Sequence, residues 1–198
     1  MKRPPEWVDI ERPKKPKKLP NVLSTNEVIA IINSINNLNH KLCMLLIYSA
    51  GLRRSELLNL RRKDIHMERR TQHIKGGKGK KDRYVTLAET VIPYLEKYMK
   101  VYRPMRWLIE GQNGRKYSAT FLQKIFVKAL EQSKINSYAT LHTLRHSYAT
   151  HCIENGHNLK SVQEALVHAL LKTTEIYLHI LSDALKKLKS PLDNLDID

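Results

Sequence analysis

The spacing of apolar residues from residue 22 onward predicts that the chain begins its ordered part with a helix. In LSTNEVIAIINSI, Ser24 is followed three residues later by Glu27, the spacing of a capping box at a helix start. Apolar residues then recur at helical spacing, which indicates one buried face. The residues assigned to that face are Val28, Ile29, Ile32 and Ile35.

Further helices are predicted on both sides of a region with a different pattern. A second apolar helix runs through LCMLLIYSA and stops at Gly51, and a short helix, SELLNL, follows Arg53 and Arg54. Its leucines, Leu57, Leu58 and Leu60, should face inward. Helical periodicity returns in TVIPYLEKYMKVY, where proline stands near the start and is tolerated. Residues 119–133 form an amphipathic helix, and three or four shorter helices follow, broken at Gly156, near 170–172 and at 181–182.

The region between these helices predicts a small sheet. Residues 71–87, TQHIKGGKGKKDRYVTL, contain two short extended runs around a Gly/Lys-rich turn, which is typical of a β-hairpin with a basic tip. WLIEGQNGRKYS, built on Gly111, Asn113 and Gly114, predicts a loop. The expected fold is therefore mainly α with a small antiparallel β-sheet (α+β), in one domain of about 175 residues.

The two ends of the chain have a different composition. Residues 1–20 include RPKKPKKLP, which predicts a linker or arm, either solvated or lying along phosphates. The end of the chain, SPLDNLDID, is acidic with spaced leucine and isoleucine residues. It could dock on a neighbouring protomer or be a frayed terminus.

Charge narrows the class of partner. The net charge is +16 and the pI is about 9.9, which favours a polyanion such as nucleic acid over a basic protein without a specific partner. No run of 18 apolar residues exists, so no transmembrane helix is expected, and the charged start argues against a secretory signal. Cys43 and Cys152 lie too far apart for a zinc motif and are predicted to be buried thiols in a reducing cytoplasm.

HTLRHSYATH, residues 142–151, allows a metal site, a core helix or a phosphate site. His142 and His146 are four apart and share a helix face, but Arg145 between them would repel a cation, and a third ligand is lacking. The guanidinium of Arg145 matches phosphate oxygens, and a histidine one turn away can donate a second hydrogen bond. Phosphate binding is therefore favoured, although His-x-x-Arg alone is a weak motif.

Four stretches in order make the pattern specific: GLRRSELLNL, GGKGKKDRYVTL, HTLRHSYATH and LVHALLKTTEIYLHI. Together they resemble the catalytic domain of the tyrosine recombinases, the phage-integrase and Xer-type family, from about Val22 to about Leu181. The resemblance implies residues 1–20 as a linker, 21–181 as the catalytic domain and 182–198 as a C-terminal helix and acidic tail. It also implies that the family's N-terminal core-binding domain is not part of this chain.

The resemblance assigns the phosphate-binding positions. In the family, residues at the positions of Arg53, His142 and Arg145 surround the scissile phosphate, with His168 at the later histidine position. Glu56 stands where an acidic residue buttresses the first arginine. Residues expected to contact the DNA around the site are Arg54, Lys75, Lys80, Lys81 and Arg83.

The resemblance also implies the reaction. Tyr177 is the nucleophile that forms a 3′-phosphotyrosyl bond, and Lys78 is the general acid toward the leaving 5′ oxygen. The implied partners are double-stranded DNA and further copies of the chain, as a tetramer on DNA. Neither metal nor cofactor is implied, because positive side chains take the part that Mg²⁺ plays in other phosphoryl transfers.

Several alternatives stay open. Tyr177 could be a half-buried helix residue, and Lys78 competes with its neighbouring lysines. Val167 replaces the glycine of the family's Leu-Gly-His and could misplace His168. The chain could therefore be a non-catalytic DNA-binding module, or a type IB topoisomerase-like enzyme that relaxes DNA. Among the other histidines, His146, His151 and His179 are expected to support the core or surface, and His66 and His73 to be exposed.

Overall fold

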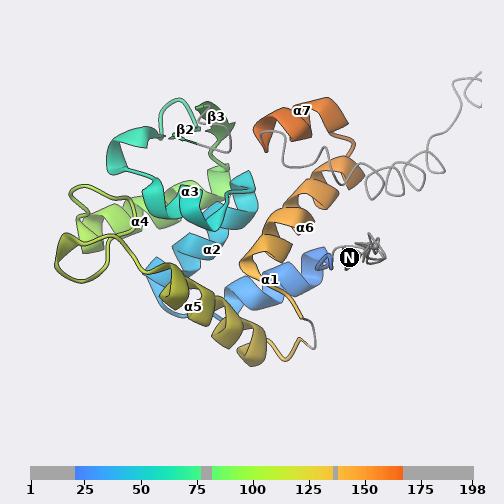
Figure 1. Cartoon of the computed structure of the whole chain (residues 1–198), viewed down its shortest axis with the longest axis horizontal. Helices are drawn as coiled ribbons and strands as arrows, with labels where there is room; N and C mark the ends of the chain where they lie inside the picture. Colours follow the sequence, from blue (N-terminus) through green and yellow to red (C-terminus); the bar gives the residue numbers. More distant parts are fainter. Residues whose placement is uncertain (1–20, 77–81, 136–137, 167–198) are drawn as a thin grey trace, which may run out of the picture.

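The structure is a computed structural model, and it describes residues 21–76, 82–135 and 138–166. Figure 1 shows the helices around a central α2, with a small sheet at one edge. The helices are α1 (Thr25–Asn33), α2 (Leu38–Ala50), α3 (Arg54–Asn59), α4 (Ile92–Tyr102), α5 (Ala119–Gln132), α6 (Leu141–Glu154) and α7 (Leu159–Ala165). The strands are β1 (Ile65–His66), β2 (Thr71–Ile74) and β3 (Arg83–Thr86), and short 3-10 turns lie at Arg62–Asp64, Glu89–Val91 and Gln112–Gly114.

Helix α1 begins as the sequence predicts, and its inward face differs from the predicted one at a single residue. The backbone N–H of Ser24 donates to Glu27 Oε2 at 2.7 Å, and the N–H of Glu27 donates to Ser24 Oγ at 3.3 Å, which confirms the capping box. Ile31 is fully buried, whereas Ile29 is exposed. Val28 and Ile35 are buried and Ile32 is partly buried, as predicted, so only the prediction for Ile29 is wrong. Packing of α1 against both α2 and α5 decides which residues point inward.

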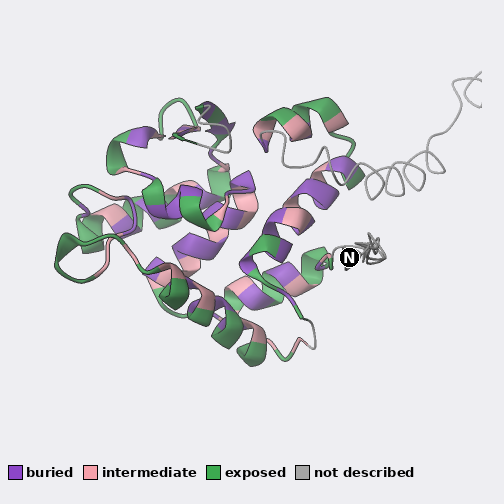
Figure 2. Ribbon diagram, in the orientation of Figure 1, coloured by how far each residue is buried: buried purple, intermediate pink, exposed green. Residues whose placement is uncertain are grey.

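Helix α2 is the centre of the core. It contacts α1, α3, α4, α5 and α6, and its apolar residues are buried on several sides, as Figure 2 shows. It ends at Gly51, which adopts a left-handed conformation with φ +57°. A Cβ at this position would lie 2.6 Å from side-chain atoms of Tyr148 and of Leu166, so only glycine fits where α2, α6 and the end of α7 meet.

The predicted hairpin is present and carries one extra strand. β2 and β3 pair antiparallel with Gln72 opposite Val85, and the two-residue β1 pairs with β2 at its other edge, giving the order β1-β2-β3. β1 was not predicted because two residues are too few to show an alternating pattern. His73 was expected to be exposed, but its ring stacks on Tyr84 at 4.5 Å and its side chain is only 19% exposed.

The remaining expectations for the described chain are mostly confirmed. Pro93 lies in the first turn of α4, and residues 107–118 form a loop apart from one 3-10 turn. Cys43 is fully buried, whereas Cys152 is only partly buried. The fold is mainly helical with one small antiparallel sheet. The helix breaks predicted near residues 170–172 and 181–182 lie outside the described residues.

Candidate active site

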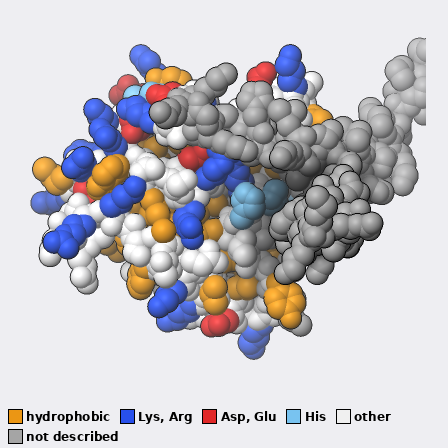
Figure 3. Space-filling model, viewed as in Figure 1, with side chains coloured by type: hydrophobic (Ala, Val, Ile, Leu, Met, Phe, Trp, Pro, Cys, Tyr) orange, Lys and Arg blue, Asp and Glu red, His pale blue; other side chains and the backbone are white. Residues whose placement is uncertain are grey.

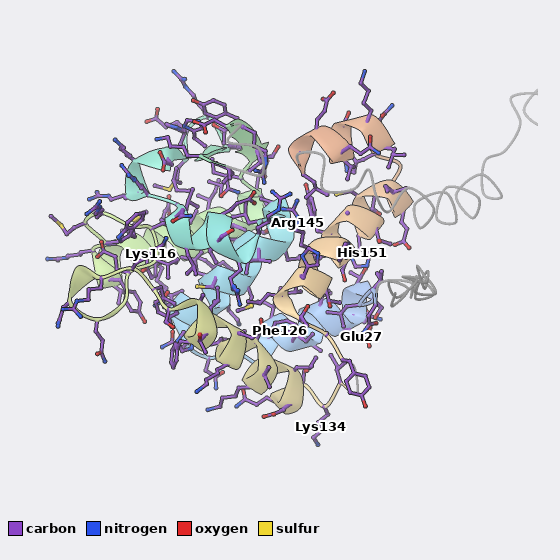
Figure 4. All side chains as sticks on the ribbon, in the orientation of Figure 1. Glu27, Lys116, Phe126, Lys134, Arg145 and His151 are labelled. Carbon is purple, nitrogen blue, oxygen red and sulfur yellow. The ribbon has the colours of Figure 1, made fainter. Side chains whose placement is uncertain are left out.

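Three arginines from three separate elements converge on one buried carboxylate, that of Glu56 in α3. Arg83, the first residue of β3, donates from Nη1 and Nη2 to the two oxygens of Glu56 at 3.0 and 2.9 Å. Arg53, just before α3, donates from Nη1 at 2.7 Å and from its backbone N–H at 2.8 Å. Nη1 of Arg145, from α6, lies 3.5 Å from Glu56 Oε2. Figure 4 shows Arg145 between α6 and α3.

The same arginines hold the end of α7. Arg83 Nε donates to the carbonyl of Ala165 at 2.7 Å, and Arg145 Nη2 donates to the carbonyl of Leu166 at 2.7 Å. Arg145 also donates to the carbonyl of Gly51. The last carbonyls of a helix have no partner within the helix and carry partial negative charge, so guanidinium groups are suitable partners. The cluster therefore ties the sheet, α3 and α6 to the C-terminal end of α7.

The cluster carries more positive than negative charge. Burial alone would raise the pKa of Glu56, but the hydrogen bonds from Arg83 and the backbone of Arg53, with the charges of Arg83 and Arg145, lower it to about 2. Glu56 is therefore ionised at neutral pH, with three guanidinium charges around one carboxylate. The positive charge left over attracts an anion.

A cleft of about 370 Å³ lies beside the cluster. It opens between the start of α3, the middle of α5 and the start of α6. Arg53, whose side chain is 20% exposed, reaches it, and His142 stands at the first turn of α6. Its lining residues are Leu52, Arg53, Arg54, Ser55, Gln123, Thr140, Leu141 and His142. Two cationic side chains, two hydroxyls and a histidine make this cleft suitable for a phosphate.

Two of the histidines of α6, His142 and His146, have lowered pKa values. Their rings meet edge to face with centroids 4.4 Å apart. Partial burial and the charges of Arg145 and Arg53 lower the pKa of His142. Burial, with the charges of His142 and Arg145, lowers the pKa of His146 to about 4. A bound phosphate would counter these charges and make it easier for His142 to take up a proton.

The lowered pKa of His146 predicts that the protein loses stability in mild acid. An unfolded histidine takes up a proton near pH 6.5, but His146 in the folded chain does so only near pH 4. The free energy of unfolding should therefore fall as pH drops from about 6.5 toward 4. Urea denaturation at several pH values measures this. His146→Gln should flatten the dependence, whereas His157→Gln, at an exposed position, should not; equal slopes in the two variants would contradict the prediction.

The structure brings together some of the predicted site residues. Arg53, Arg145 and His142 gather around Glu56 and the cleft, but Arg145 is more buried than Arg53, with a 4% exposed side chain, and does not line the cleft. Arg54 is exposed and lines the cleft. Lys75 does not line the cleft, and its Nζ pairs with Asp64 at 2.7 Å.

Arg83 does not fit its predicted role as a DNA contact. Its side chain is 7% exposed, and its guanidinium is engaged by Glu56 and Ala165. Arg83 instead holds the site together, because it joins β3 to Glu56 of α3 and to Ala165 of α7. These contacts are between residues far apart in the chain, so the local sequence does not reveal them. The predicted residues Lys78, Lys80, Lys81, Val167, His168, Tyr177 and His179 lie outside the described residues.

Three further residues line the cleft although no motif in the sequence indicates them: Ser55, Gln123 and Thr140. Thr140 caps α6 because its hydroxyl accepts the N–H of Thr143. A threonine just before HTLRH is typical of a helix start, so the sequence could have indicated this role. His151 supports the core as expected, since its Nδ1 lies 2.8 Å from the hydroxyl of Tyr48. Within the described residues, no three His, Cys, Asp or Glu side chains are grouped so that they could hold a metal ion.

The fold and the cleft define a basic helical domain whose cleft lies beside a cluster of arginines, two of them buried. The chain belongs to the phage integrase family, whose sequence pattern matches residues 21–183. It is 42% identical over 189 residues to a tyrosine recombinase of Thermosipho africanus, across 90% of this chain and 65% of that protein. It is 37% identical over 187 residues to tyrosine recombinase XerA of Pyrococcus horikoshii, across 91% of this chain and 65% of that protein.

Solved structures agree with this assignment. A crystal structure of XerA recombinase covers 88% of this chain and 66% of its own, with a TM-score of 0.77 and 26% identity. XerH recombinase bound to its palindromic difH substrate, in a post-cleavage complex, covers 86% of this chain and 52% of its own, with a TM-score of 0.75 and 30% identity. The fold is that of a tyrosine recombinase catalytic domain, and the chain spans just under two thirds of the length of these curated relatives. No helix in the described part of the chain is long and apolar enough to cross a membrane.

Proposed function

We propose that this chain is the catalytic domain of a site-specific DNA recombinase or integrase that cleaves and rejoins strands through a 3′-phosphotyrosyl intermediate. The observation that carries the proposal is the cluster of Arg53, Arg83 and Arg145 around Glu56, beside a cleft with His142 at its edge. Such a site suits a phosphodiester, because its positive charge is fixed before the substrate arrives. Fixed charges need no reorganisation during the reaction, so they stabilise the transition state more than mobile water does.

The described residues would act on the phosphate itself. Arg53 and His142 would donate to its non-bridging oxygens, whose negative charge grows as the fifth oxygen adds to phosphorus. Arg145 contributes its charge from behind and keeps Glu56 ionised. Glu56 and Arg83 position the other two arginines and do not touch the substrate.

The nucleophile and the acid are proposed from the family's motifs. Tyr177 passes its proton to a neighbouring base, and its oxygen forms a bond to phosphorus while the bond from phosphorus to the 5′ oxygen breaks. Lys78 gives a proton to that leaving oxygen, and His168 completes the phosphate-binding set. Because the energy of the phosphodiester is kept in the tyrosyl bond, a free 5′ hydroxyl can reverse the step without ATP, metal or cofactor.

The proposed partner is double-stranded DNA, bound by a tetramer of this chain. The net charge of +16 supports a DNA partner, and XerH is seen bound to its difH substrate. One related fold, that of lambda integrase, is seen as a tetramer bound to a Holliday junction, at 18% identity. We further propose the division into a 1–20 linker, a 21–181 catalytic domain and a 182–198 tail that docks on a neighbouring protomer, with DNA cleavage in the cytoplasm.

The test is to trap and map the covalent intermediate. The protein is incubated in EDTA with a pool of nicked duplexes of randomised sequence. Cleavage next to the nick frees a short fragment that begins with the new 5′ hydroxyl and diffuses away, and the strand that ends in the 3′ phosphate stays attached to the protein. We expect a protease-sensitive adduct whose nucleotide mass maps to Tyr177 by peptide mass spectrometry. Attachment at another tyrosine, such as Tyr48 or Tyr148, would contradict the assignment.

The same experiment separates the competing functions. DNA binding without an adduct would indicate a non-catalytic DNA-binding module. An adduct together with relaxation of supercoiled DNA, but without joining of strands from two duplexes, would indicate a topoisomerase-like enzyme. An adduct with joined strands from two duplexes supports recombination.

A further inference from the structure

A second basic surface lies at the far end of α3 from the cleft. After α3, residues Leu60–Arg62 run antiparallel to Arg106–Leu108: the N–H of Leu108 donates to the carbonyl of Leu60 at 2.7 Å, and Arg61 bridges to Trp107. We call this the Trp107 patch, and its members are Arg61, Arg62, Lys63, Arg106, Trp107 and Lys116. Figure 3 shows Lys and Arg side chains over much of the face seen in Figure 1.

The cations of the patch are held in place around one aromatic ring. The charged ends of Arg61, Arg106 and Lys116 lie 5.6, 5.1 and 5.3 Å from the centre of the Trp107 ring. Lys116 also donates to the side chain of Asn59 at the end of α3. Cation–π contacts reduce the freedom of long side chains before any ligand binds, so less conformational entropy is lost on binding.

Among the described residues, no carboxylate forms an ion pair with the side chains of the patch. Glu110 uses one carboxylate oxygen to accept the backbone N–H groups of Met105, Arg106 and Trp107. Asp64 is buried, pairs with Lys75, and accepts only the backbone N–H of Arg61 from the patch. Within the described parts of the chain, Arg62 and Lys63 form no ion pair and are exposed. Collecting five cations costs repulsion, and a polyanion relieves that cost.

We infer that the Trp107 patch binds the phosphate backbone of the same DNA duplex that occupies the cleft; this inference rests on the proposed function. Arg53 at the cleft and Arg61 at the patch are eight positions apart in the chain, and most of the residues between them belong to α3. At a helical rise of 1.5 Å per residue, the two positions are separated by about 12 Å. One strand carries a phosphate per 3.4 Å of duplex axis, so the patch would contact the backbone about three to four base pairs from the cleaved bond.

The patch suits phosphates rather than bases. Bases of single strands stack on open aromatic faces, but three cations already surround the Trp107 ring. Contacts to phosphates position a protein on DNA and carry no sequence information directly. The patch therefore sets the register of the duplex on the domain and raises affinity for any sequence.

The experiment measures the salt dependence of DNA binding. The variant Arg62→Gln/Lys63→Gln removes two exposed charges and leaves the three cations around Trp107 in place. Its matched control, Lys128→Gln/Lys134→Gln, removes two exposed charges from the far end of α5, where Figure 4 shows Lys134 remote from Lys116. Binding of a random-sequence duplex is followed by fluorescence anisotropy over a range of salt concentrations, and unfolding is checked by thermal melting.

We expect the slope of log affinity against log salt to become less negative by about 2 in the patch variant, since each lost phosphate contact changes it by about 0.9. The control should keep the slope of the unsubstituted chain. Equal slopes in the patch variant and the unsubstituted chain, with both folded, would overturn the inference and leave the proposed function standing. Failure of the unsubstituted chain to bind any duplex would instead overturn the proposed function, and the inference with it.

Discussion

Replacing Glu56 with alanine is expected to lower the free energy of unfolding by about 3–5 kcal/mol, because a buried ion pair that loses one partner leaves the other charge uncompensated. Here one carboxylate faces three guanidinium groups, and the side chains of Arg83 and Arg145 are 7% and 4% exposed. Without Glu56 they would repel each other in a site that excludes most water. Urea denaturation at neutral pH measures the loss.

The control for Glu56 is Glu27→Ala, which removes a partly exposed carboxylate that accepts the backbone N–H and the hydroxyl of Ser24. Its loss should cost about 1 kcal/mol, the usual net value of a hydrogen bond. The effect of Glu56→Ala also has a defined pH dependence. Since the pKa of Glu56 is lowered to about 2, its contribution is present above about pH 4.5 and disappears as pH falls toward 2. Equal losses in the two variants at neutral pH would show that the cluster does not depend on Glu56.

Replacing Arg53 with lysine is expected to slow formation of the covalent adduct by about 10²–10³-fold, the usual cost of removing one donor that stabilises transition-state charge. Among the described residues, Arg53 is the only arginine of the cluster that both hydrogen-bonds Glu56 and lines the cleft. A lysine keeps the charge, but it lacks the planar guanidinium that can donate to Glu56 and to a phosphate in the cleft at the same time. The rate is measured at saturating DNA, with the nicked duplexes used to trap the intermediate.

The matched control for Arg53 is its neighbour Arg54, which is exposed and lines the same cleft without bonding Glu56 in the described contacts. Arg54→Lys should change the rate by less than about tenfold, because a point charge serves a backbone phosphate nearly as well as a fork. A similar loss in both variants would mean that the cleft requires charge alone, and that Arg53 has no special place in it.

Much of this fold follows from local sequence signals. The capping box of Ser24 and Glu27, the α2 stop at Gly51 and the 71–87 hairpin are each set by residues close together in the chain, and the structure confirms all three. The two-residue strand β1 depends on its packing partners, as does the burial of Ile31 in place of Ile29 in α1, so the sequence pattern could not determine either.

The candidate site was predictable in its members but not in their arrangement. Ordered motifs pointed to Arg53, His142 and Arg145, which the structure brings near one cleft. Motif spacing could not show that Arg83 is buried against Glu56, because that contact joins residues 27 apart in the chain and depends on how the sheet meets α3. The role of a basic residue, surface contact or internal support, is decided by tertiary packing.

Arg145 shares its guanidinium among Glu56 and the carbonyls of Gly51 and Leu166. Arg53, which lines the cleft, also donates from Nη2 to the carbonyl of Leu166 at 3.5 Å. A phosphate bound in the cleft therefore competes with this carbonyl for that donor. Occupancy of the cleft and retention of the last turn of α7 are then linked equilibria, and linkage is reciprocal: if binding loosens that turn, loosening it must strengthen binding by the same factor. Amide hydrogen exchange at Leu166, compared with and without DNA, would report the sign and size of this allosteric coupling.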